Sequence, residues 1–335
     1  MSNDVLLQLT GVVKEFTVKV GSGFKRRKRS LQAVAGVDLS LRRGETLGLV
    51  GESGCGKSTL ARCVMRLFAV DSGRVVFDGD DLTHASNAVL KPYRRRMQMV
   101  FQDPYGSLNP RRRVGSIIGD PFRIQGVGSA ADRQAKVQEL MQLVGLNPEH
   151  YNRFPGEFSG GQRQRIGIAR AIALRPELIV CDEPVSALDV SIQAQVLNLL
   201  ADLQKELGLT YLFISHDLSV VRHVSDRVAV MYLGTIVEIA PSEAIYERTR
   251  HPYTSALLSA VPRFEADAGT ARVESVLSGD PPSPLDPPSG CRFHPRCPRA
   301  QDRCRHEVPV LRVGNADDPE HLTACHFPLV DGDAS

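Results

Sequence analysis

The sequence predicts an α/β fold from three observations. An apolar strand at Thr46–Val50 leads through a glycine-rich loop into a helix at Thr59–Phe68. A second apolar strand begins at Leu178 and ends in two carboxylates, and a third spans Tyr211–Ile214. Between these two strands, the pattern at Ile192–Leu207 is helical. Apolar strands that alternate with helices are typical of an α/β core.

Length and composition exclude several classes of protein. With 335 residues, the chain can bury the core of one large domain with an appendage, or of two domains. Hydrophobic residues make up 42% and charged residues 24%, and the net charge of +3 gives no sign of nucleic-acid binding. No apolar run approaches a membrane span, and the N-terminal MSNDVLLQLT lacks the regions of a signal peptide. We therefore expect a chain that is neither secreted nor membrane-spanning.

Residues 5–50 predict antiparallel strands, because apolar and polar positions alternate there. A basic run, Lys25–Arg29, interrupts the pattern. This run is either a solvated hairpin tip or a contact for lipid headgroups. Phe16 is a candidate for stacking on an adenine ring, although a phenylalanine in a strand is more often part of the core.

The glycine-rich loop, GLVGESGCGKS at residues 48–58, fits the G-x-x-x-x-G-K-[ST] pattern that binds nucleotide phosphates. Its glycines let the backbone curl so that successive N–H groups point at a phosphate. Lys57 adds a mobile positive charge, and the Ser58 hydroxyl is a hard ligand suited to Mg²⁺. The candidate nucleotide-binding residues are Gly51, Glu52, Ser53, Gly54, Cys55, Gly56, Lys57, Ser58 and Thr59.

The middle of the chain carries two further candidate sites. Residues 73–84 indicate a strand and a turn, and Gln102 then follows a short apolar strand, where a neutral ligand can touch Mg²⁺. From Leu108 to Phe158 the pattern is helical, most clearly at Asp132–Val144. Ser159 is a good N-cap for the next helix, and two glycines behind a capped helix make a second candidate anion site. That site comprises Ser159, Gly160, Gly161 and Gln162.

Polar residues follow the second and third apolar strands. Asp182 and Glu183 are adjacent at a strand end, so their side chains point in different directions. Asp182 can then face Mg²⁺ while Glu183 faces a water molecule. Asp189 follows in the segment Ser-Ala-Leu-Asp, and His216 lies where the third strand ends. A histidine alone at such a place is more often structural, but its position after the other motifs indicates a role in the site.

Four cysteines crowd the C-terminal region, namely Cys291, Cys297, Cys304 and Cys325. Their C-x5-C-x6-C-x20-C spacing lacks the close pairs of structural zinc sites, whereas the ligands of a [4Fe–4S] cluster tolerate wider spacing. An Fe–S cluster, a zinc ion, and cysteines that are unliganded or disulfide-bonded are the open alternatives. A proline-rich linker at residues 279–290 precedes the cysteines, and we expect it to separate them from the phosphate loop.

These motifs, in this order over residues 16–216, resemble the nucleotide-binding subunit of an ATP-binding cassette (ABC) transporter. Four further segments are similar to the dipeptide/oligopeptide importer branch, and most of all to its second ATPase subunit. They are PYGSLNPR at 104–111, EPVSALDVSIQAQ at 183–195, HPYT at 251–254, and the cysteine-bearing tail.

The resemblance implies a P-loop ATPase fold with an antiparallel β subdomain. It places an ABC ATPase domain at 1–250, with a helical subdomain at about 108–175, and a C-terminal extension at 251–335 with the four-cysteine cluster. It implies that residues 51–59 bind the phosphates and Mg²⁺, that Asp182 orients Mg²⁺, and that Gln102 couples the metal to the membrane subunits.

The resemblance also assigns catalytic and partner-facing roles. Glu183 polarises the attacking water, His216 contacts the γ-phosphate, and Phe16 stacks on adenine. In a head-to-tail dimer, residues 159–162 serve the partner's ATP and Asp189 supports the opposing site. Members of this branch carry a [4Fe–4S] cluster at such cysteines, so the resemblance implies that cluster as well.

The function so implied is ATP hydrolysis that drives di- or oligopeptide import. The implied partners are a second, homologous ATPase subunit, two permease subunits and an extracytoplasmic peptide-binding protein, without nucleic acid. The chain would lie at the cytoplasmic face of the cell membrane. Nickel, opines or glutathione move through similar machines. A soluble ABC ATPase of DNA repair or translation is a further alternative, but such proteins carry long coiled-coil insertions or two cassettes, and this sequence has neither.

Overall fold

The computed structural model describes residues 5–20, 27–260, 279–314 and 318–330. They form two compact units. Unit 1 comprises Arg42–Thr46 and His84–Ile214, and unit 2 comprises Val5–Leu41, Leu47–Thr83 and the described residues from Ser215 onward. Within these ranges, no helix is both long and apolar enough to cross a membrane.

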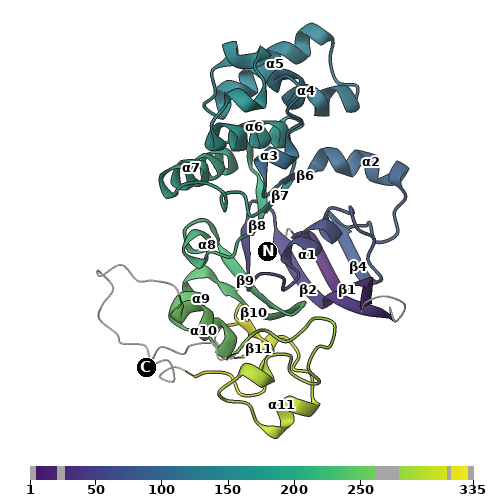
Figure 1. The fold of residues 1–335 in the computed structure, drawn as a ribbon, viewed down its shortest axis with the longest axis vertical. Coiled ribbons are helices and arrows are strands. Elements are labelled where there is room, and N and C mark those ends of the chain that lie inside the picture. The colour runs from purple at the N-terminus through teal and green to yellow at the C-terminus, as the bar shows by residue number, and fades with distance from the viewer. Residues whose placement is uncertain (1–4, 21–26, 261–278, 315–317, 331–335) are drawn as a thin grey trace. The chain divides into compact units, whose positions relative to one another are not determined.

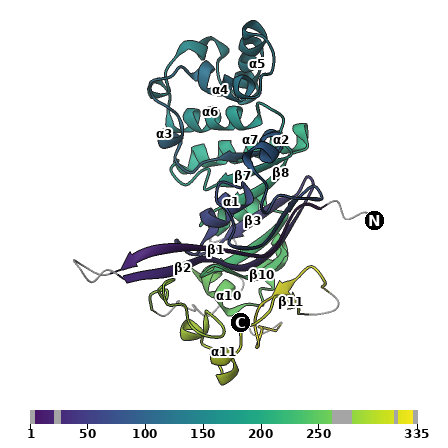
Figure 2. The same ribbon diagram turned by 90° about the vertical axis from the view of Figure 1, so that its right-hand side faces the viewer.

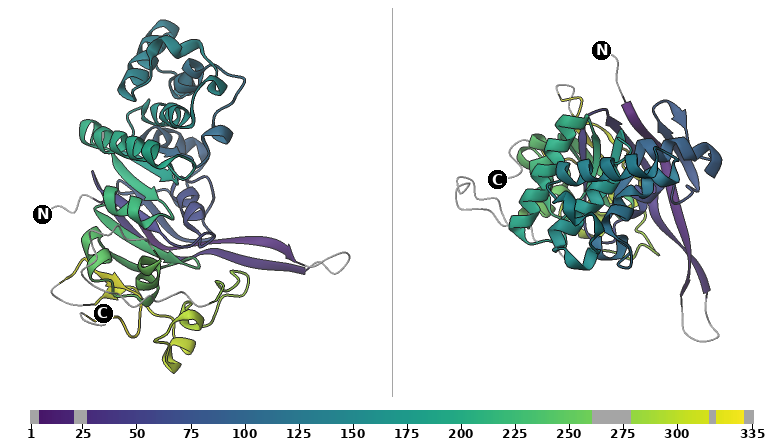
Figure 3. Two further views of the ribbon diagram at one scale, coloured as in Figure 1. Left: turned by 60° about the vertical axis from the view of Figure 1, so that its left-hand side comes forward. Right: turned by 90° about the horizontal axis from the view of Figure 1, so that it is seen from above.

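Unit 2 contains an antiparallel sheet with the strand order β2-β1-β4-β5. Its strands are β1 (Val5–Val20), β2 (Arg27–Arg42), β4 (Ser72–Phe77) and β5 (Asp80–Asp81). The pairing of β1 with β4 ends at Val13↔Ser72, so the second half of β1 runs on beside β2 beyond β4. Figures 2 and 3 show this long two-stranded arm. The prediction of antiparallel strands for residues 5–50 is confirmed for β1 and β2, which lie in this sheet, whereas Thr46–Val50 belongs to another set of strands and pairs in parallel there.

The basic run lies at the start of β2. Arg27, Lys28 and Arg29 are exposed there, whereas Lys25 and Arg26 lie outside the described residues. The guanidinium of Arg29 lies 3.9 Å from the Asp286 carboxylate. Both side chains are largely exposed, so this ion pair contributes little to stability.

A second set of strands in unit 2 has the order β11-β12-β10-β9-β3. Strand β3 is parallel to β9, and the other pairs are antiparallel. The strands are β3 (Thr46–Val50), β9 (Arg227–Tyr232), β10 (Thr235–Pro241), β11 (Arg312–Val313) and β12 (Leu322–Thr323). Two short strands of the C-terminal region, β11 and β12, therefore extend a sheet that begins with the strand before the phosphate loop.

The helices of unit 2 are short. They are α1 (Lys57–Val64), α8 (Leu218–Val224), α9 (Ser242–Glu247), α10 (Pro252–Ser259), the 3₁₀-helix η5 (His294–Arg296) and α11 (Asp302–His306). The predicted helix at Thr59–Phe68 starts earlier and ends at Val64. It ends early because Arg66 takes a left-handed conformation with φ of 52°, which a right-handed helix cannot continue.

Unit 1 combines three parallel strands with a group of helices. The strands β6 (Met97–Val100), β7 (Leu178–Asp182) and β8 (Thr210–Ile214) have the order β6-β7-β8, and Leu178 pairs with both Met97 and Thr210. Figure 1 shows α4, α5 and α6 at one end of this unit and the strands at the other. The helices are α2 (Asn87–Arg96), α3 (Pro104–Ser107), α4 (Val114–Ile124), α5 (Ala130–Leu143), η2 (Pro148–Asn152), η3 (Pro155–Glu157), α6 (Gly160–Ile172) and α7 (Val190–Leu207).

Candidate functional site

The phosphate loop connects the buried strand β3 to helix α1. Gly51, Gly54 and Gly56 have φ angles of 151°, 78° and 112°, which side-chain-bearing residues rarely adopt. A Cβ at Gly51 would overlap the Met231 carbonyl oxygen, and a Cβ at Gly56 would overlap that of Ala33. Gly51 and Gly56 are therefore needed for both conformation and space, and Gly54 for conformation alone. The loop curls as predicted.

Lys57 is buried at the start of α1, with its side chain turned back over the loop. Its Nζ donates hydrogen bonds to the carbonyl oxygens of Gly51 at 2.7 Å and Glu52 at 3.0 Å. Burial raises the pKa of the nearby Cys55 thiol, so this side chain is neutral at pH 7. Ser58 is half-buried in the first turn of α1. The loop thus holds one ammonium group among backbone dipoles, which is an arrangement suited to a phosphate.

Two other predicted site residues lie in unit 2. Phe16 is half-buried on β1 and makes an edge contact with the Phe68 ring, with ring centroids 5.5 Å apart. His216 is exposed after the end of β8, beside Asp217, whose carboxylate caps α8.

The carboxylate pair lies in unit 1, at the end of β7. Asp182 is 3% exposed, whereas Glu183 is partly exposed and has a φ of 49°. A left-handed conformation in a residue other than glycine is strained, and such strain is concentrated at functional sites. The Glu183 carboxylate accepts a hydrogen bond of 2.9 Å from the Gln102 side-chain amide. The structure therefore brings together the predicted glutamine and the predicted base.

Helix α6 begins with the capping box that the sequence predicts. The Ser159 hydroxyl accepts a hydrogen bond from the Gln162 N–H at 3.3 Å, and the Gln162 side chain accepts one from the Ser159 N–H at 3.0 Å. Both residues are exposed, which leaves this helix N-terminus open to a ligand. Asp189 is exposed immediately before α7 and makes no side-chain cap there.

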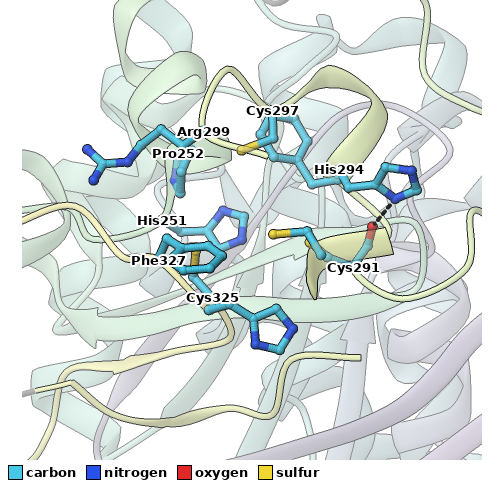
Figure 4. Close-up of a pocket in the computed structure, with 11 residues that line it drawn as sticks. His251, Pro252, Cys291, His294, Cys297, Arg299, Cys325 and Phe327 are labelled. Atoms are coloured by element: carbon cyan, nitrogen blue, oxygen red, sulfur yellow. Dashed lines mark hydrogen bonds between the residues drawn. The ribbon is translucent and has the colours of Figure 1, made fainter. Parts of the chain in front are cut away.

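The four C-terminal cysteines line one cavity of unit 2, together with His251, His294 and five neighbouring side chains (Figure 4). The cavity has a volume of about 10 Å³, room for about one water molecule. All seven cysteines are free thiols, which excludes the disulfide alternative in this structure. Burial raises the pKa of Cys291 and Cys297, and that of Cys325 to about 12. Among the described residues, no group of three or more His, Cys, Asp or Glu side chains is placed to hold a metal ion.

The expected separation of the cysteine region from the phosphate loop is wrong. Both lie in unit 2, and the Arg296 guanidinium, one residue before Cys297, forms an ion pair with the Glu52 carboxylate of the loop at 2.9 Å. Residues 279–290 are a linker in sequence, but the chain returns to the sheet through β12 and to the loop through Arg296. The arginines around the cysteines are a feature of the sequence that fits this contact, since one of them, Arg296, meets the loop carboxylate.

A glycine-curled loop between a buried strand and a helix defines a P-loop nucleotide-binding protein. Comparison with known protein families shows which group of P-loop proteins this chain resembles. The model of the ABC transporter family matches residues 34–186, and that of the oligopeptide/dipeptide transporter C-terminal region matches residues 237–304.

Named relatives match nearly the whole chain. The oligopeptide transport ATP-binding protein AppF of Bacillus subtilis (strain 168) is 52% identical over 97% of this chain and 98% of the relative. The probable peptide ABC transporter ATP-binding protein y4tS of Sinorhizobium fredii is 54% identical over 97% of this chain and 90% of the relative. Among solved structures, the dimeric post-hydrolysis state of the ATP-binding cassette MJ0796 bound to ADP and Pi superimposes with a TM-score of 0.62 at 28% identity, covering 71% of this chain and 99% of that one. The chain belongs to the ABC transporter family, in its group of peptide-transport ATP-binding proteins.

Proposed function

We propose that this chain hydrolyses ATP to power the uptake of di- or oligopeptides through an ABC importer. The phosphate loop carries this proposal, because its glycine-dependent curl and buried lysine together form a cradle suited to a phosphate. The relatives are named as ATP-binding proteins of peptide transport, which supports the peptide cargo. Nickel, opines or glutathione are alternative cargoes, since permeases and binding proteins select what is transported.

For the chemistry, we assign phosphate binding to residues 51–59 and general-base activation of the attacking water to Glu183. The hydrogen bond from Gln102 supports this assignment, because it fixes the direction of the Glu183 carboxylate. His216 would donate a hydrogen bond to the γ-phosphate, and Phe16 would stack on adenine. These groups bind and orient the reactants, and positioning is the main source of rate enhancement in phosphoryl transfer.

Magnesium is the cofactor that this chemistry implies. The Ser58 hydroxyl, the Gln102 side-chain oxygen and the Asp182 carboxylate are hard oxygen donors, which fit Mg²⁺ in kind. When bound, the ion would neutralise charge on the phosphates.

We further propose a head-to-tail dimer with a second, homologous ATPase subunit. The open N-terminus of α6 supports it, since an exposed capped helix end can bind the γ-phosphate of a nucleotide held by the partner. Residues 159–162 would make that contact, and Asp189 would support the opposing site. Dimers are described for two ABC cassette structures that are similar in fold.

The remaining parts of the proposal concern the assembly. Two permease subunits and an extracytoplasmic peptide-binding protein would complete the importer, with this chain at the cytoplasmic face of the membrane and without nucleic acid. In sequence, residues 1–250 would form the ATPase domain, with a helical subdomain at about 108–175, and residues 251–335 the extension.

We assign the four-thiol cavity to a [4Fe–4S] cluster, with Zn²⁺ as the alternative. The donor set fits in kind, because four free thiols face one cavity. A single ion would require the sulfurs to be grouped around one point, whereas a cluster binds each sulfur to a different iron. Cys291, Cys297, Cys304 and Cys325 would hold the cluster, which would staple a C-terminal region that is too small for its own core.

The function is tested by isolating the chain from membranes with its partners. We expect permease subunits to co-purify and the reconstituted complex to hydrolyse ATP when the peptide-loaded binding protein is added. Lys57→Ala should abolish this turnover, because it removes the positive charge of the loop. Turnover at the wild-type rate in Lys57→Ala, or isolation without any membrane protein, would contradict the proposal.

A further inference from the structure

Glu52 of the phosphate loop is held by two side chains from the C-terminal part of the chain. Its backbone N–H donates a hydrogen bond to the Tyr253 hydroxyl at 3.0 Å. Its two carboxylate oxygens accept hydrogen bonds of 2.9 and 3.0 Å from the two terminal nitrogens of Arg296. A two-pronged bond of this kind fixes the orientation of the groups as well as pairing their charges.

Arg296 is anchored by its surroundings. Its side chain is only 6% exposed. Its Nη1 also lies 3.5 Å from the Tyr232 hydroxyl, to which it donates. The Tyr232 and Tyr253 rings are 4.6 Å apart, and each lies 5.3 Å from the Phe293 ring, all three being fully buried. This aromatic packing limits the movement of the guanidinium, so Arg296 holds Glu52 in a defined place.

The backbone of Arg296 belongs to the frame of the cysteine cavity. The 3₁₀-helix η5 ends at Arg296 and lies between Cys291 and Cys297. The His294 N–H donates to the Cys291 carbonyl at 3.0 Å, and the Cys291 N–H donates to the Cys304 carbonyl at 2.8 Å. The positions of three of the four cysteines and of Arg296 are therefore set by one short, hydrogen-bonded segment.

Lys57 contacts the same part of the loop as Arg296 and Tyr253. It binds the carbonyl oxygens of Gly51 and Glu52, while Tyr253 and Arg296 bind the N–H and the carboxylate of Glu52. The carboxylate is the only negatively charged side chain within residues 51–59. Left without its arginine, it would repel the phosphates of an incoming nucleotide.

We propose that Arg296 and Tyr253 are positioning residues of the phosphate loop, and that the four-thiol cavity sets the affinity for ATP through Arg296. The inference rests on the proposed ATP site. The hydrogen-bonded packing around the four thiols fixes η5 and presents Arg296 to Glu52. Disruption of that packing would loosen η5 and free the Glu52 carboxylate. The C-terminal extension thereby controls nucleotide binding as well as stabilising the fold.

The first test measures the dissociation constant of a fluorescent ATP analogue for the full-length chain. Arg296→Ala should raise it about 10-fold to 100-fold, the contribution of charge-assisted hydrogen bonds. Arg296→Lys should restore only part of the affinity, because an ammonium group cannot form the two-pronged bond. Glu52→Gln in the Arg296→Ala background should also restore part of it by removing the unpaired charge. A purely structural role of Arg296 would not produce that rescue.

A second, gentler variant covers the case in which Arg296→Ala fails to fold. Tyr253→Phe removes one oxygen atom and should weaken analogue binding about threefold, the value of one neutral hydrogen bond. Tyr246→Phe is its matched control, because the Tyr246 hydroxyl donates to the Leu218 carbonyl, away from the loop. Arg303→Ala is the control for Arg296, because Arg303 pairs with Glu307 at the surface. Both controls should bind as the wild type does. Wild-type affinity in Tyr253→Phe and in folded Arg296→Ala would overturn the proposal.

A double-mutant comparison tests whether the cysteines act on ATP binding through Arg296. Cys297→Ser should weaken analogue binding, and the double variant Cys297→Ser/Arg296→Ala should bind no more weakly than Arg296→Ala. If the two substitutions lower the affinity additively, or if Cys297→Ser does not lower it, the proposed connection between the cysteines and Arg296 is overturned. Lys57→Ala separates this inference from the proposed function. If Lys57→Ala binds as the wild type does, the ATP site itself is wrong. If it loses binding while Arg296→Ala does not, only the present inference fails.

Discussion

A methyl group added at Gly51 tests the geometry of the phosphate loop directly. The new Cβ of Gly51→Ala would overlap the Met231 carbonyl oxygen and lie 2.9 Å from Cys55 Sγ. Met231 cannot withdraw, because it belongs to β9, which is paired with β3 on one side and β10 on the other. The loop itself must therefore move, and with it the N–H groups that face a phosphate.

The cost of Gly51→Ala has two parts. Overpacking by one methyl group costs about 1–3 kcal/mol where neighbours are fixed. A side chain at the Gly51 φ of 151° is also strained, at a cost of about 1–3 kcal/mol. The total of about 2–6 kcal/mol exceeds the roughly 1.4 kcal/mol that corresponds to a tenfold change in affinity. We expect the dissociation constant for ATP to rise about 100-fold or more.

Gly54→Ala is the matched control in the same loop. Gly54 has a φ of 78°, but an added Cβ there meets nothing within 4 Å. This variant carries only the backbone strain of about 1–2 kcal/mol and should lose about tenfold in affinity. Titration with a fluorescent ATP analogue compares the two, and thermal melting shows that both are folded. Equal affinities in folded Gly51→Ala and Gly54→Ala would refute the reasoning from the Met231 contact.

Three further changes probe other parts of the molecule. Glu183→Gln should slow ATP turnover by the assembled complex by about 10²–10⁴-fold, the contribution of a general base, while ATP binding persists; phosphate release at the wild-type rate would show that another group activates the water. Glu238→Gln should lower the free energy of unfolding by about 2–4 kcal/mol at pH 7, because the fully buried carboxylate accepts hydrogen bonds from Thr249, His321 and two backbone N–H groups. Burial alone would raise the pKa of Glu238, but these hydrogen bonds leave that pKa below its usual range. The stability that the ionised carboxylate gives to the fold is therefore complete above about pH 4.3, the unfolded-state pKa, and is lost as the pH falls through the folded-state pKa. Urea unfolding of the wild type and of Glu238→Gln at pH 7 and pH 3 measures this difference in the free energy of unfolding. An equal difference at both pH values would contradict the prediction. Cys325→Ser should remove the brown colour and the iron, about four atoms per chain, of protein purified without oxygen; colourless wild-type protein with one zinc ion would decide for the alternative metal.

Local sequence patterns predicted the parts of the fold that depend on neighbouring residues. The strand Thr46–Val50 has the predicted bounds, and Ser159 caps α6 as expected. Both follow from short-range physics, since an apolar run favours a buried strand and a serine oxygen can reach a backbone N–H three residues on. The curl of the phosphate loop was predictable for the same reason, because it requires glycines within one short segment.

Tertiary structure alone decided the contacts between distant segments. Gln102 meets Glu183 because β6 and β7 are neighbours in the sheet, and Glu183 takes a left-handed conformation that its residue type disfavours. Arg296 meets Glu52, across 244 positions of sequence, because β12 adds to the same set of strands as β3. Sequence spacing cannot indicate such a contact, since chain connectivity does not restrict which surfaces meet when two segments are this far apart along the chain. The linker separates the two regions along the chain, but the burial of aromatic rings and the pairing of charges bring them together in space.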